Sequence, residues 1–520
     1  MFLVRRKVVL TVVLAAALVA AGCGGGGGSG AGTTSNPQGS LAGPDQSIVV
    51  AGVEPAQVDF HKNVDNGGRL SLGEVYETLY IADESGQIVP LLADGQPTRI
   101  DDTTYDITLK TGVVFSDGTP FNADSAVFSI NRVVSPAIAT QLADVSTIAG
   151  AEKVDDTTIR VKTKVASPLL ANRLMTTAMY RPQTTDPTKP DQIIGTGPYK
   201  VVSFTPGTGT KITYNDKFRG QKPQVTNVEV RFIPDAGTRV QAISAGEVDV
   251  VPEITPLEAR GLQNVVATSK PAWSAFVRLN TLTGGTEDAT LRQAMNYAVD
   301  RDAIVKQVFG DQYASASQCT PLPMGTGGTS TNVKMPYTYD PEKAKQLVNE
   351  AGANGRTIEM ISSSGAFTED RAVAELVAQS LNAVGLKINL QYLSPFSVYS
   401  AQLIKSQMNA PPMTFAGMVD SRSHVDRALQ NYYSSSGPPS AFNDPEVDKL
   451  ITEATSAADQ QAAQPVYDQL LQRACDEAAY IYLYDYKTIF GLSPRIKWEP
   501  GVDSFGWNLR YDQMQVYSTN

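Results

Sequence analysis

The chain has 520 residues, a formal net charge of −10 and three cysteines. A chain of this length buries a large core and is expected to divide into more than one lobe. The acidic balance, with no basic cluster beyond the first seven residues, argues against a nucleic-acid-binding protein.

The N-terminal segment has the pattern of a secretion signal. Three cations at residues 5–7 precede an apolar run over residues 8–21. That run is shorter than the roughly 20 residues that a membrane-spanning helix needs. Residues 20–23, Ala-Ala-Gly-Cys, resemble a lipobox, in which the cysteine is acylated and becomes the new N-terminus. We therefore predict a signal peptide at residues 1–22 and lipidation of Cys23; the alternative is an ordinary signal peptide with an incidental cysteine.

The segment after the signal is rich in glycine, serine and threonine and has no apolar periodicity. Such a sequence cannot bury enough apolar surface to offset the entropy that is lost when it becomes ordered. Residues 23–44 are therefore predicted to be a flexible tether that begins at the lipidated cysteine.

A strand, a turn and a helix are predicted between residues 104 and 132. Residues 104–110 alternate apolar and polar side chains, which is typical of a half-buried strand. Ser-Asp-Gly-Thr at residues 116–119 supplies a turn, and Asn122 is placed to cap a helix with one apolar face.

Further strands follow in the first half of the chain. A polar turn at residues 155–158 leads into an alternating segment over residues 159–165, which predicts a second strand of the same small subdomain. Three more strands, separated by turns that contain proline and glycine, are expected at residues 201–204, 211–214 and 225–232.

The second half is predicted to be more helical. Residues 291–299 place apolar side chains at helical spacing, and Asp340 and Asp444 each precede a proline that suits the first turn of a helix. Strands at residues 358–362 and 387–392 alternate with these helices. This order predicts an α/β lobe in which helices flank a sheet.

Several of these segments resemble, in chain order, the landmarks of the family 5 extracellular solute-binding proteins, the peptide- and nickel-binding receptors of ABC importers. The resemblance covers roughly residues 48–515. The segments that carry it are residues 73–79, 90–93, 104–132, 195–199, 245–249, 291–301 and 339–352.

The resemblance implies an α/β fold of the two-lobed periplasmic-binding-protein type. The expected architecture is type II, in the large cluster with an extra subdomain, with central sheets flanked by helices and an interlobe ligand cleft. The segments over residues 270–280 and 480–489 would be the two crossings that act as a hinge. The expected divisions are lobe I at residues 45–80, 193–271 and 487–520, an accessory subdomain at 81–192, and lobe II at 272–486.

Signatures of catalysis are missing from the sequence. It contains no Gly-x-Ser-x-Gly elbow, no Gly-Lys dipeptide for a phosphate loop and no Cys-x-x-Cys pair. The two histidines, His61 and His424, are too far apart in sequence to form a metal-binding helix face. We expect a protein that is not an enzyme and that uses no cofactor or bound metal.

The resemblance also identifies a site for a ligand amine. Peptide-binding relatives hold the free α-amine with an aspartate after a Gly-Trp-x-x-Asp strand, and residues 416–420 are similar to that segment, with Asp420 in the carboxylate position. Gly417 stands where the family usually has tryptophan, which predicts a wider pocket beside Met418. The alternative for Asp420 is a solvated loop acid or a helix cap.

Five other residues are candidates for the cleft. Trp273 and Arg278 lie on the expected hinge strand, where Arg278 would favour an anionic group on the ligand. Tyr76 and Glu77 would contribute from the first lobe, and His424 would bind a metal chelate. The alternatives are a core position for Trp273, a surface charge or a lobe–lobe salt bridge for Arg278, packing for Tyr76 and an ordinary loop position for His424.

Two cysteines remain once Cys23 is assigned to the lipid. Cys319 and Cys475 would work in an oxidising compartment, where two thiols can pair. The alternative is that both are small buried hydrophobic residues. The sequence leaves this choice open.

The resemblance implies an extracytoplasmic lipoprotein that is anchored to the cell membrane or works in the periplasmic space. It would be a monomer that captures a small solute, with a di- or oligopeptide preferred, by closing its lobes. Delivery would require the permease and ATPase subunits of an ABC importer. The alternatives are a receptor for a nickel chelate, a sugar or another non-peptide solute, and, from a different class, an extracytoplasmic chaperone.

Overall fold

The computed structural model describes residues 39–62, 66–83, 86–139, 145, 147–419, 424–457, 459–501 and 509–518. The predicted signal peptide, Cys23 and Asp420 lie outside the described residues. Within the described part, Leu41 forms a bridge with Tyr517, and the N–H of Ala42 donates to the carbonyl of Val516 at 2.9 Å. The last residues of the predicted tether therefore pair with the C-terminal segment.

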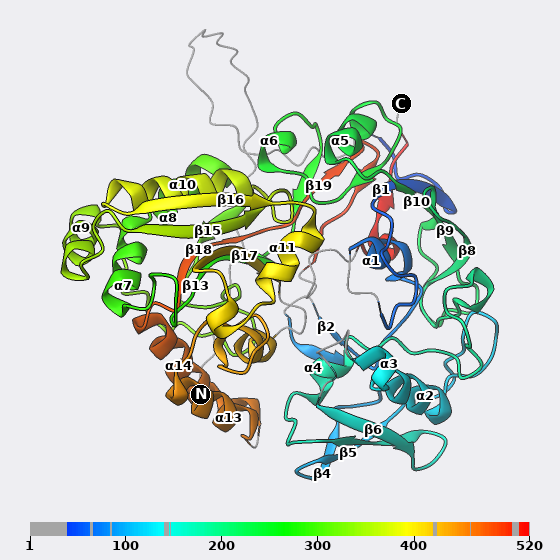
Figure 1. Cartoon of the computed structure of the whole chain (residues 1–520). Helices are drawn as coiled ribbons and strands as arrows, with labels where there is room; N and C mark the ends of the chain where they lie inside the picture. The colour runs from blue at the N-terminus through cyan, green and yellow to red at the C-terminus, as the bar shows by residue number, and fades with distance from the viewer. Residues whose placement is uncertain are drawn as a thin grey trace, which may run out of the picture. The chain divides into compact units, whose positions relative to one another are not determined.

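A seven-stranded sheet, with its helices, forms what we call the first lobe (Figure 1). Its strand order is β12-β19-β11-β1-β10-β9-β8, with β1 parallel to β10 and β11. The strands are β1 (Gln46–Gly52), β8 (Tyr199–Thr205), β9 (Gly209–Tyr214), β10 (Val225–Phe232), β11 (Val250–Val251), β12 (Val265–Ala267) and β19 (Ile489–Leu492). The strands predicted at residues 201–204, 211–214 and 225–232 are confirmed as β8, β9 and β10.

Short helices and a small ribbon complete the first lobe. Ala242 and Ile243 of α5 pack with Ala51 of β1 and Ile489 of β19 in a small core. The remaining elements of this lobe are α1 (Asn66–Leu72), α5 (Ala236–Ser244), α6 (Pro256–Ala259), β20 (Ile496–Lys497) and β21 (Gln515–Val516).

A four-stranded antiparallel sheet, ordered β4-β5-β7-β6, belongs to what we call the accessory subdomain. Asn122 caps α2 as predicted, its side chain accepting a hydrogen bond from the N–H of Ser125 at 3.3 Å. The elements are β2 (Tyr80–Ala82), β3 (Ile88–Pro90), β4 (Thr98–Asp101), β5 (Thr104–Thr108), α2 (Ala123–Val133), α3 (Pro136–Ala139), β6 (Ile148–Lys153), β7 (Thr158–Thr163) and α4 (Leu170–Leu174).

A six-stranded sheet forms the centre of what we call the second lobe, with the order β14-β18-β13-β17-β15-β16. Strand β15 is parallel to β16 and β17, whereas β13 is antiparallel to β17 and β18. The strands are β13 (Trp273–Leu279), β14 (Ala314–Ala316), β15 (Thr357–Ser363), β16 (Lys387–Leu393), β17 (Met413–Val419) and β18 (Tyr480–Tyr486).

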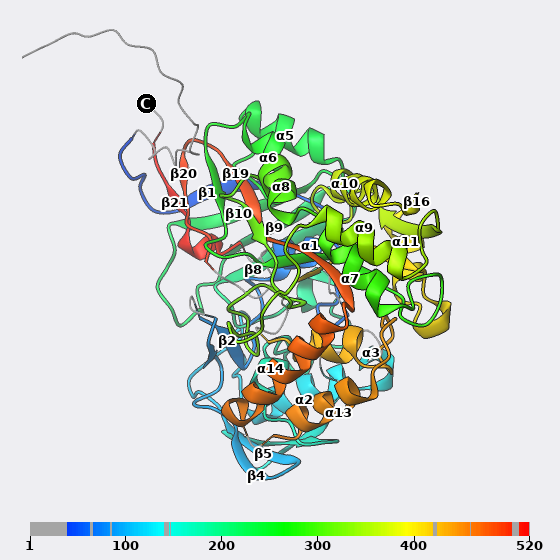
Figure 2. The same ribbon diagram turned by 90° about the vertical axis from the view of Figure 1, so that its left-hand side faces the viewer.

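Helices cover both faces of this sheet (Figures 1 and 2). Alternate residues of β13 enter different cores: Val277 packs with α7, α9 and α10, whereas Phe276 packs with α13 and α14. Asp340 and Asp444 cap α9 and α13 as predicted. The helices are α7 (Ala289–Ala298), α8 (Arg301–Ile304), α9 (Pro341–Glu350), α10 (Asp370–Ala383), α11 (Phe396–Leu403), α12 (Asp426–Ala428), α13 (Pro445–Thr455) and α14 (Gln460–Asp476).

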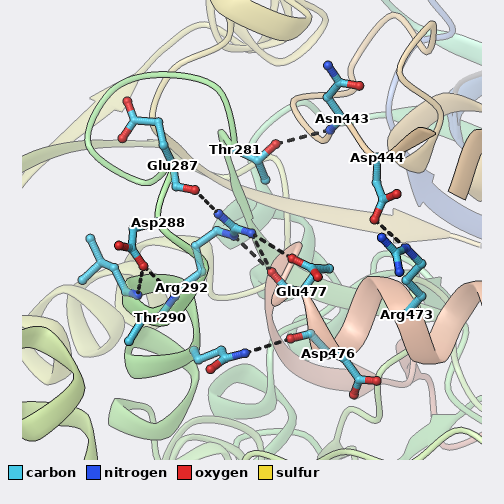
Figure 3. A network of polar contacts seen from close by, with 12 residues as sticks. Thr281, Glu287, Asp288, Thr290, Arg292, Asn443, Asp444, Arg473, Asp476 and Glu477 are labelled. Carbon is cyan, nitrogen blue, oxygen red and sulfur yellow. Dashed lines mark hydrogen bonds and ion pairs between the residues drawn. The ribbon is translucent and has the colours of Figure 1, made fainter. Parts of the chain in front are cut away.

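A buried arginine fixes the start of α7 against the end of α14 (Figure 3). Arg292 Nη2 donates to the carbonyl of Glu477 at 2.9 Å, and its Nη1 donates to the carbonyl of Glu287 at 2.7 Å. Nearby, Arg473 Nε donates to Asp444 Oδ2 at 2.7 Å, which links α14 to the cap of α13. The Arg292 contacts join helices that cover opposite faces of the six-stranded sheet, whereas the Arg473 contact joins two helices on the same face.

Two segments lead directly between the seven-stranded and six-stranded sheets. One runs from β12 to β13, and the other runs from β18 to β19. They lie side by side, because the N–H of Thr268 donates to the carbonyl of Thr488 at 3.0 Å and the N–H of Ala272 donates to that of Tyr486 at 3.0 Å. Among the described residues, no helix has the length and apolar character that crossing a bilayer requires.

Candidate functional site

An aromatic wall stands where β13, β17 and β18 end next to the two connecting segments. The register places Trp273 beside Val419 on one side and Tyr486 on the other. The Trp273 ring stacks on Tyr486, with centroids 6.0 Å apart and planes at 17°, and it meets Phe367 nearly edge-on at 6.3 Å. Trp273 is only partly buried, so this wall presents aromatic surface at the ends of these central strands.

The space beside Gly417 is filled by the ring of Phe367. A Cβ atom at residue 417 would come within 2.7 Å of Phe367 Cδ1. The same ring contacts Tyr399 and Phe415, at centroid distances of 6.1 and 6.3 Å. The ring of Phe367, from another part of the chain, therefore occupies the space into which a Cβ atom at residue 417 would point, and the wider pocket stays a prediction.

A buried carboxylate lies on the opposite face of these strand ends. Ser274, which faces Met418 across the sheet, donates a hydrogen bond from Oγ to Asp485 Oδ1 at 2.6 Å. Burial raises the pKa of Asp485 to about 6, while hydrogen bonds from Ser274, Ser317 and the N–H of Met324 oppose that rise. Met418 packs on the core that includes α13 and α14.

Protonation of Asp485 should make the stability of the protein depend on pH. Between about pH 4 and pH 6 the folded protein holds a proton on Asp485 that the unfolded chain has lost, so the free energy of unfolding falls as the pH rises through this window. The contribution is about 3 kcal/mol, from a shift of about two pKa units. Asp485→Asn should remove it. Urea unfolding of wild type and Asp485→Asn at pH 4 and pH 7 checks this. If the two proteins differ in free energy of unfolding by the same amount at both pH values, the prediction is contradicted.

The residues on both sides of the 420–423 segment are anchored in the second lobe. On one side, Val419 pairs with Trp273 at the end of the sheet. On the other side, His424 is buried, forms a bridge with Gly327 and accepts the N–H of Asp426 on Nδ1 at 3.1 Å. The His424 ring also meets Tyr467 edge-on at 5.1 Å. His424 is therefore packed into the fold of the second lobe, whereas the sequence suggested either a ligand of a metal chelate or an ordinary residue of a polar loop.

Arg278 takes a position that differs from the expected one. The side chain is 1% exposed, and its guanidinium donates to the carbonyls of Leu403, Lys405 and Pro439 and to Thr414 Oγ1. Burial lowers its pKa. Its donors are directed at carbonyls of the same lobe, because these loop carbonyls need partners inside the protein. The contacts of Nη1 and Nη2 give it a structural role inside the second lobe, and Nε has no hydrogen-bond partner among the described residues.

Tyr76 and Glu77 are both buried in the first lobe. The Tyr76 ring packs against Phe60 and Tyr180, at centroid distances of 5.5 and 4.9 Å, and burial raises its pKa. Glu77 receives a bidentate pair from Arg219, at 2.5 and 2.7 Å. Neither residue is brought next to the aromatic wall by any of these contacts.

A buried ion pair joins the accessory subdomain to the second lobe. Arg173 Nη2 of α4 lies 2.7 Å from Asp426 Oδ2 of α12, and the two side chains are 5% and 2% exposed. Beside it, Gln460 Nε2 donates to Asn172 Oδ1 at 3.4 Å. The sequence gives no signal for this contact, because its partners are separated by more than 250 residues and belong to no motif.

A disulfide joins Cys319 and Cys475, whose Cα atoms are 5.4 Å apart. It connects the segment that follows β14 with the end of α14. Both side chains are fully buried in the core that includes α13 and α14. The residues described contain no group of three or more His, Cys, Asp or Glu side chains placed to hold a metal ion.

Comparisons with known proteins agree with this architecture. The sequence model described as bacterial extracellular solute-binding proteins, family 5 Middle, matches residues 87–440. The chain is 24% identical over 470 residues to the glutathione-binding protein GsiB of Pectobacterium atrosepticum, covering 86% of this chain and 90% of that protein. It is 25% identical over 448 residues to the nickel-binding periplasmic protein of Escherichia coli, covering 78% and 83%.

Solved structures show the same fold. NikA from Brucella suis, in complex with Fe(III)-EDTA, superposes with a TM-score of 0.79 at 23% identity and covers 91% of this chain and 100% of that one. DppA from Helicobacter pylori, in complex with the peptide STSA, gives 0.75 at 22% identity and covers 92% and 99%. The family match spans well over half of the sequence, and the chain belongs to family 5 of the bacterial extracellular solute-binding proteins.

Proposed function

We propose that this solute-binding protein captures a di- or oligopeptide and delivers it to the permease of an ABC importer. The observation that carries the proposal is the sequence at the end of β17, in which Gly417 and Met418 precede Asp420, together with the aromatic wall of Trp273 beside Val419. Asp420 would bind the ligand amine, and the partly exposed wall would pack against the peptide. The names of the relatives point the same way, since one is a glutathione-binding protein and one structure holds a peptide.

Capture would work through movement of the lobes about the two adjacent connecting segments. Residues 268–272 and 487–488 are the short passages between the sheets, and a ligand shifts the equilibrium only through contacts that it gains on closure. The proposed divisions are lobe I at residues 45–80, 193–271 and 487–520, an accessory subdomain at 81–192, and lobe II at 272–486.

The proposed place of work is the outer face of the cell membrane. The basic and apolar N-terminus followed by Cys23 supports a lipid anchor, and the glycine-rich residues 23–44 support a tether. A flexible chain of this length has a mean reach of about 25 Å, which lets a monomer meet the permease and ATPase complex while staying attached.

A peptide titration tests the amine site. Asp420→Ala should weaken binding of a mixed tetrapeptide pool by about 100-fold, because a desolvated ammonium would lose its charge-assisted partner. Isothermal titration calorimetry measures this. N-acetylated peptides, which have no free amine, are the second probe: wild type should bind them weakly, and Asp420→Ala should bind them as well as wild type does. Glu453→Ala, at an exposed acid of α13, is the matched control. Equal binding by wild type and Asp420→Ala would refute the role of Asp420.

A metal chelate is the second candidate ligand, and the nickel-binding relative and the Fe(III)-EDTA complex of NikA favour it. Because no metal-holding cluster occurs among the residues placed by the structure, the metal would have to arrive inside its chelator. Titration with nickel–histidine alongside the peptide pool decides between the two: saturable binding of the chelate without peptide binding would replace the proposal.

A further inference from the structure

A cavity of about 580 Å³ lies between the accessory subdomain and the second lobe. One wall is formed by residues 86–88, 96–97, 105, 167–168 and 170–172, and the other by Gly325, Gly327 and Gln460. This volume falls within the range of about 300–1,000 Å³ that is usual for small-molecule sites. Of the predicted ligand-binding residues that the structure describes, none lines it.

The side chains that line the cavity within the described part of the chain are uncharged. Its polar side chains are those of Gln87, Gln96, Asn172 and Gln460, which carry amides, and of Tyr105 and Ser167, which carry hydroxyls. A charged group that entered would lose its hydration without gaining a counter-charge, whereas a neutral amide or hydroxyl would exchange water for amide donors and acceptors. The lining therefore selects against charge and favours neutral polar groups.

One buried hydroxyl in the wall has no hydrogen-bond partner within the described protein. Ser167 is 2% exposed, and its Oγ is unsatisfied, although its N–H donates to the hydroxyl of Tyr105 at 3.0 Å. An unsatisfied buried hydroxyl costs free energy. Because the oxygen is closed off from solvent, a group in the cavity would reach it only after the residues around it move.

The cavity exists only while the two walls are held together. The contact between Gln460 and Asn172 borders it, and Arg173, the next residue of α4, is paired with Asp426. Because Arg173 is already neutralised by that carboxylate, the ion pair adds no net charge beside the cavity. A group bound between the walls would stabilise the arrangement in which they meet.

We propose that this cavity is a second subsite of the receptor, which takes an uncharged polar part of the captured solute, such as a neutral amide of a peptide. The assignment rests on the proposed function, since it places a second part of the same ligand, but it predicts binding of a neutral fragment that does not use Asp420.

The test uses N-acetylglycinamide, which is neutral and has no free amine, and its acid counterpart N-acetylglycine. Saturation-transfer NMR on the full chain should show binding of the amide at least about tenfold tighter than that of the acid. Gln460→Phe, which fills the cavity from an exposed helix position, should weaken the amide by a further factor of about ten. Gln461→Phe is the matched control, since its neighbouring position on α14 is exposed and does not line the cavity.

Absence of amide binding to wild type, equal binding of the acid, or identical effects of the two phenylalanine variants would overturn the subsite. The proposed function has a different failing result. If the protein binds N-acetylglycinamide in this pattern but binds no peptide, the subsite stands and the proposed function is refuted.

Discussion

Replacing Asp426 by asparagine is expected to separate the accessory subdomain from the second lobe. The change leaves the buried guanidinium of Arg173 without this carboxylate, 2.7 Å away in the wild type. Removing one partner of a buried ion pair costs about 3–5 kcal/mol. Because α4 and α12 belong to different parts of the chain, moving them apart lets water reach Arg173, so the cost should appear as opening of this contact.

Spin labels placed at exposed acids on the two sides measure this opening. Cysteine substitutions at Asp94 in the accessory subdomain and at Glu453 on α13 supply the attachment points. The single variant should shift the distance distribution toward longer values. Arg173→Met combined with Asp426→Leu is the matched control, since it removes both charges while keeping apolar bulk and should restore the short distance. An unchanged distribution in Asp426→Asn would contradict the assignment of this ion pair as a bond that keeps the two parts together.

Elements that depend on local sequence were predicted closely. The caps Asp340 and Asp444 begin α9 and α13, because a side-chain acceptor followed by proline acts within one helical turn. The ends of strands were less accurate. Leu109 lies beyond β5 in an isolated bridge with Ala93, and Val165 lies beyond β7 and is exposed. A strand ends where its partner ends, and the sequence of one strand does not contain that information.

The two candidates on the hinge strand show that strand periodicity predicts the face of the sheet on which a side chain lies. Trp273 and Arg278 are five residues apart, so in a strand of period two they face opposite sides of the sheet. The structure follows this rule, since Trp273 meets Phe367 and Tyr486 whereas Arg278 reaches the carbonyl of Leu403. The odd spacing of the two positions alone argues against placing both side chains in one ligand-binding surface.

Pairings between distant segments were beyond reach of the sequence. Phe367 fills the space next to Gly417, and the two positions are 50 residues apart with no shared motif. Gln460 and Asn172 meet across the cavity although 288 residues separate them. Such contacts depend on how the sheets are packed together. An isolated glutamine or asparagine in the sequence therefore does not show that its side chain will line a cavity.

Removing the disulfide is expected to have the largest effect on stability. Cys319 and Cys475 are 156 residues apart, and cross-linking a loop of that length lowers the entropy of the unfolded chain. The chain-entropy relation gives about 5 kcal/mol for such a loop. The double variant Cys319→Ala/Cys475→Ala should therefore lose about this much free energy of unfolding, measured by urea denaturation. The double variant is required because a single one would leave a free buried thiol.

Reduction of the wild-type protein separates the two sources of this effect. If the bond acts on the unfolded chain, wild type in reductant should unfold at nearly the same urea concentration as the double variant. Both should also show a steeper urea dependence than oxidised wild type, since an unlinked chain exposes more surface on unfolding. If the sulfur atoms mattered chiefly through packing in the core around α14, where both are fully buried, reduced wild type would stay close to the oxidised protein and only the alanine variant would be destabilised. That second pattern would contradict the entropic origin of the stabilisation.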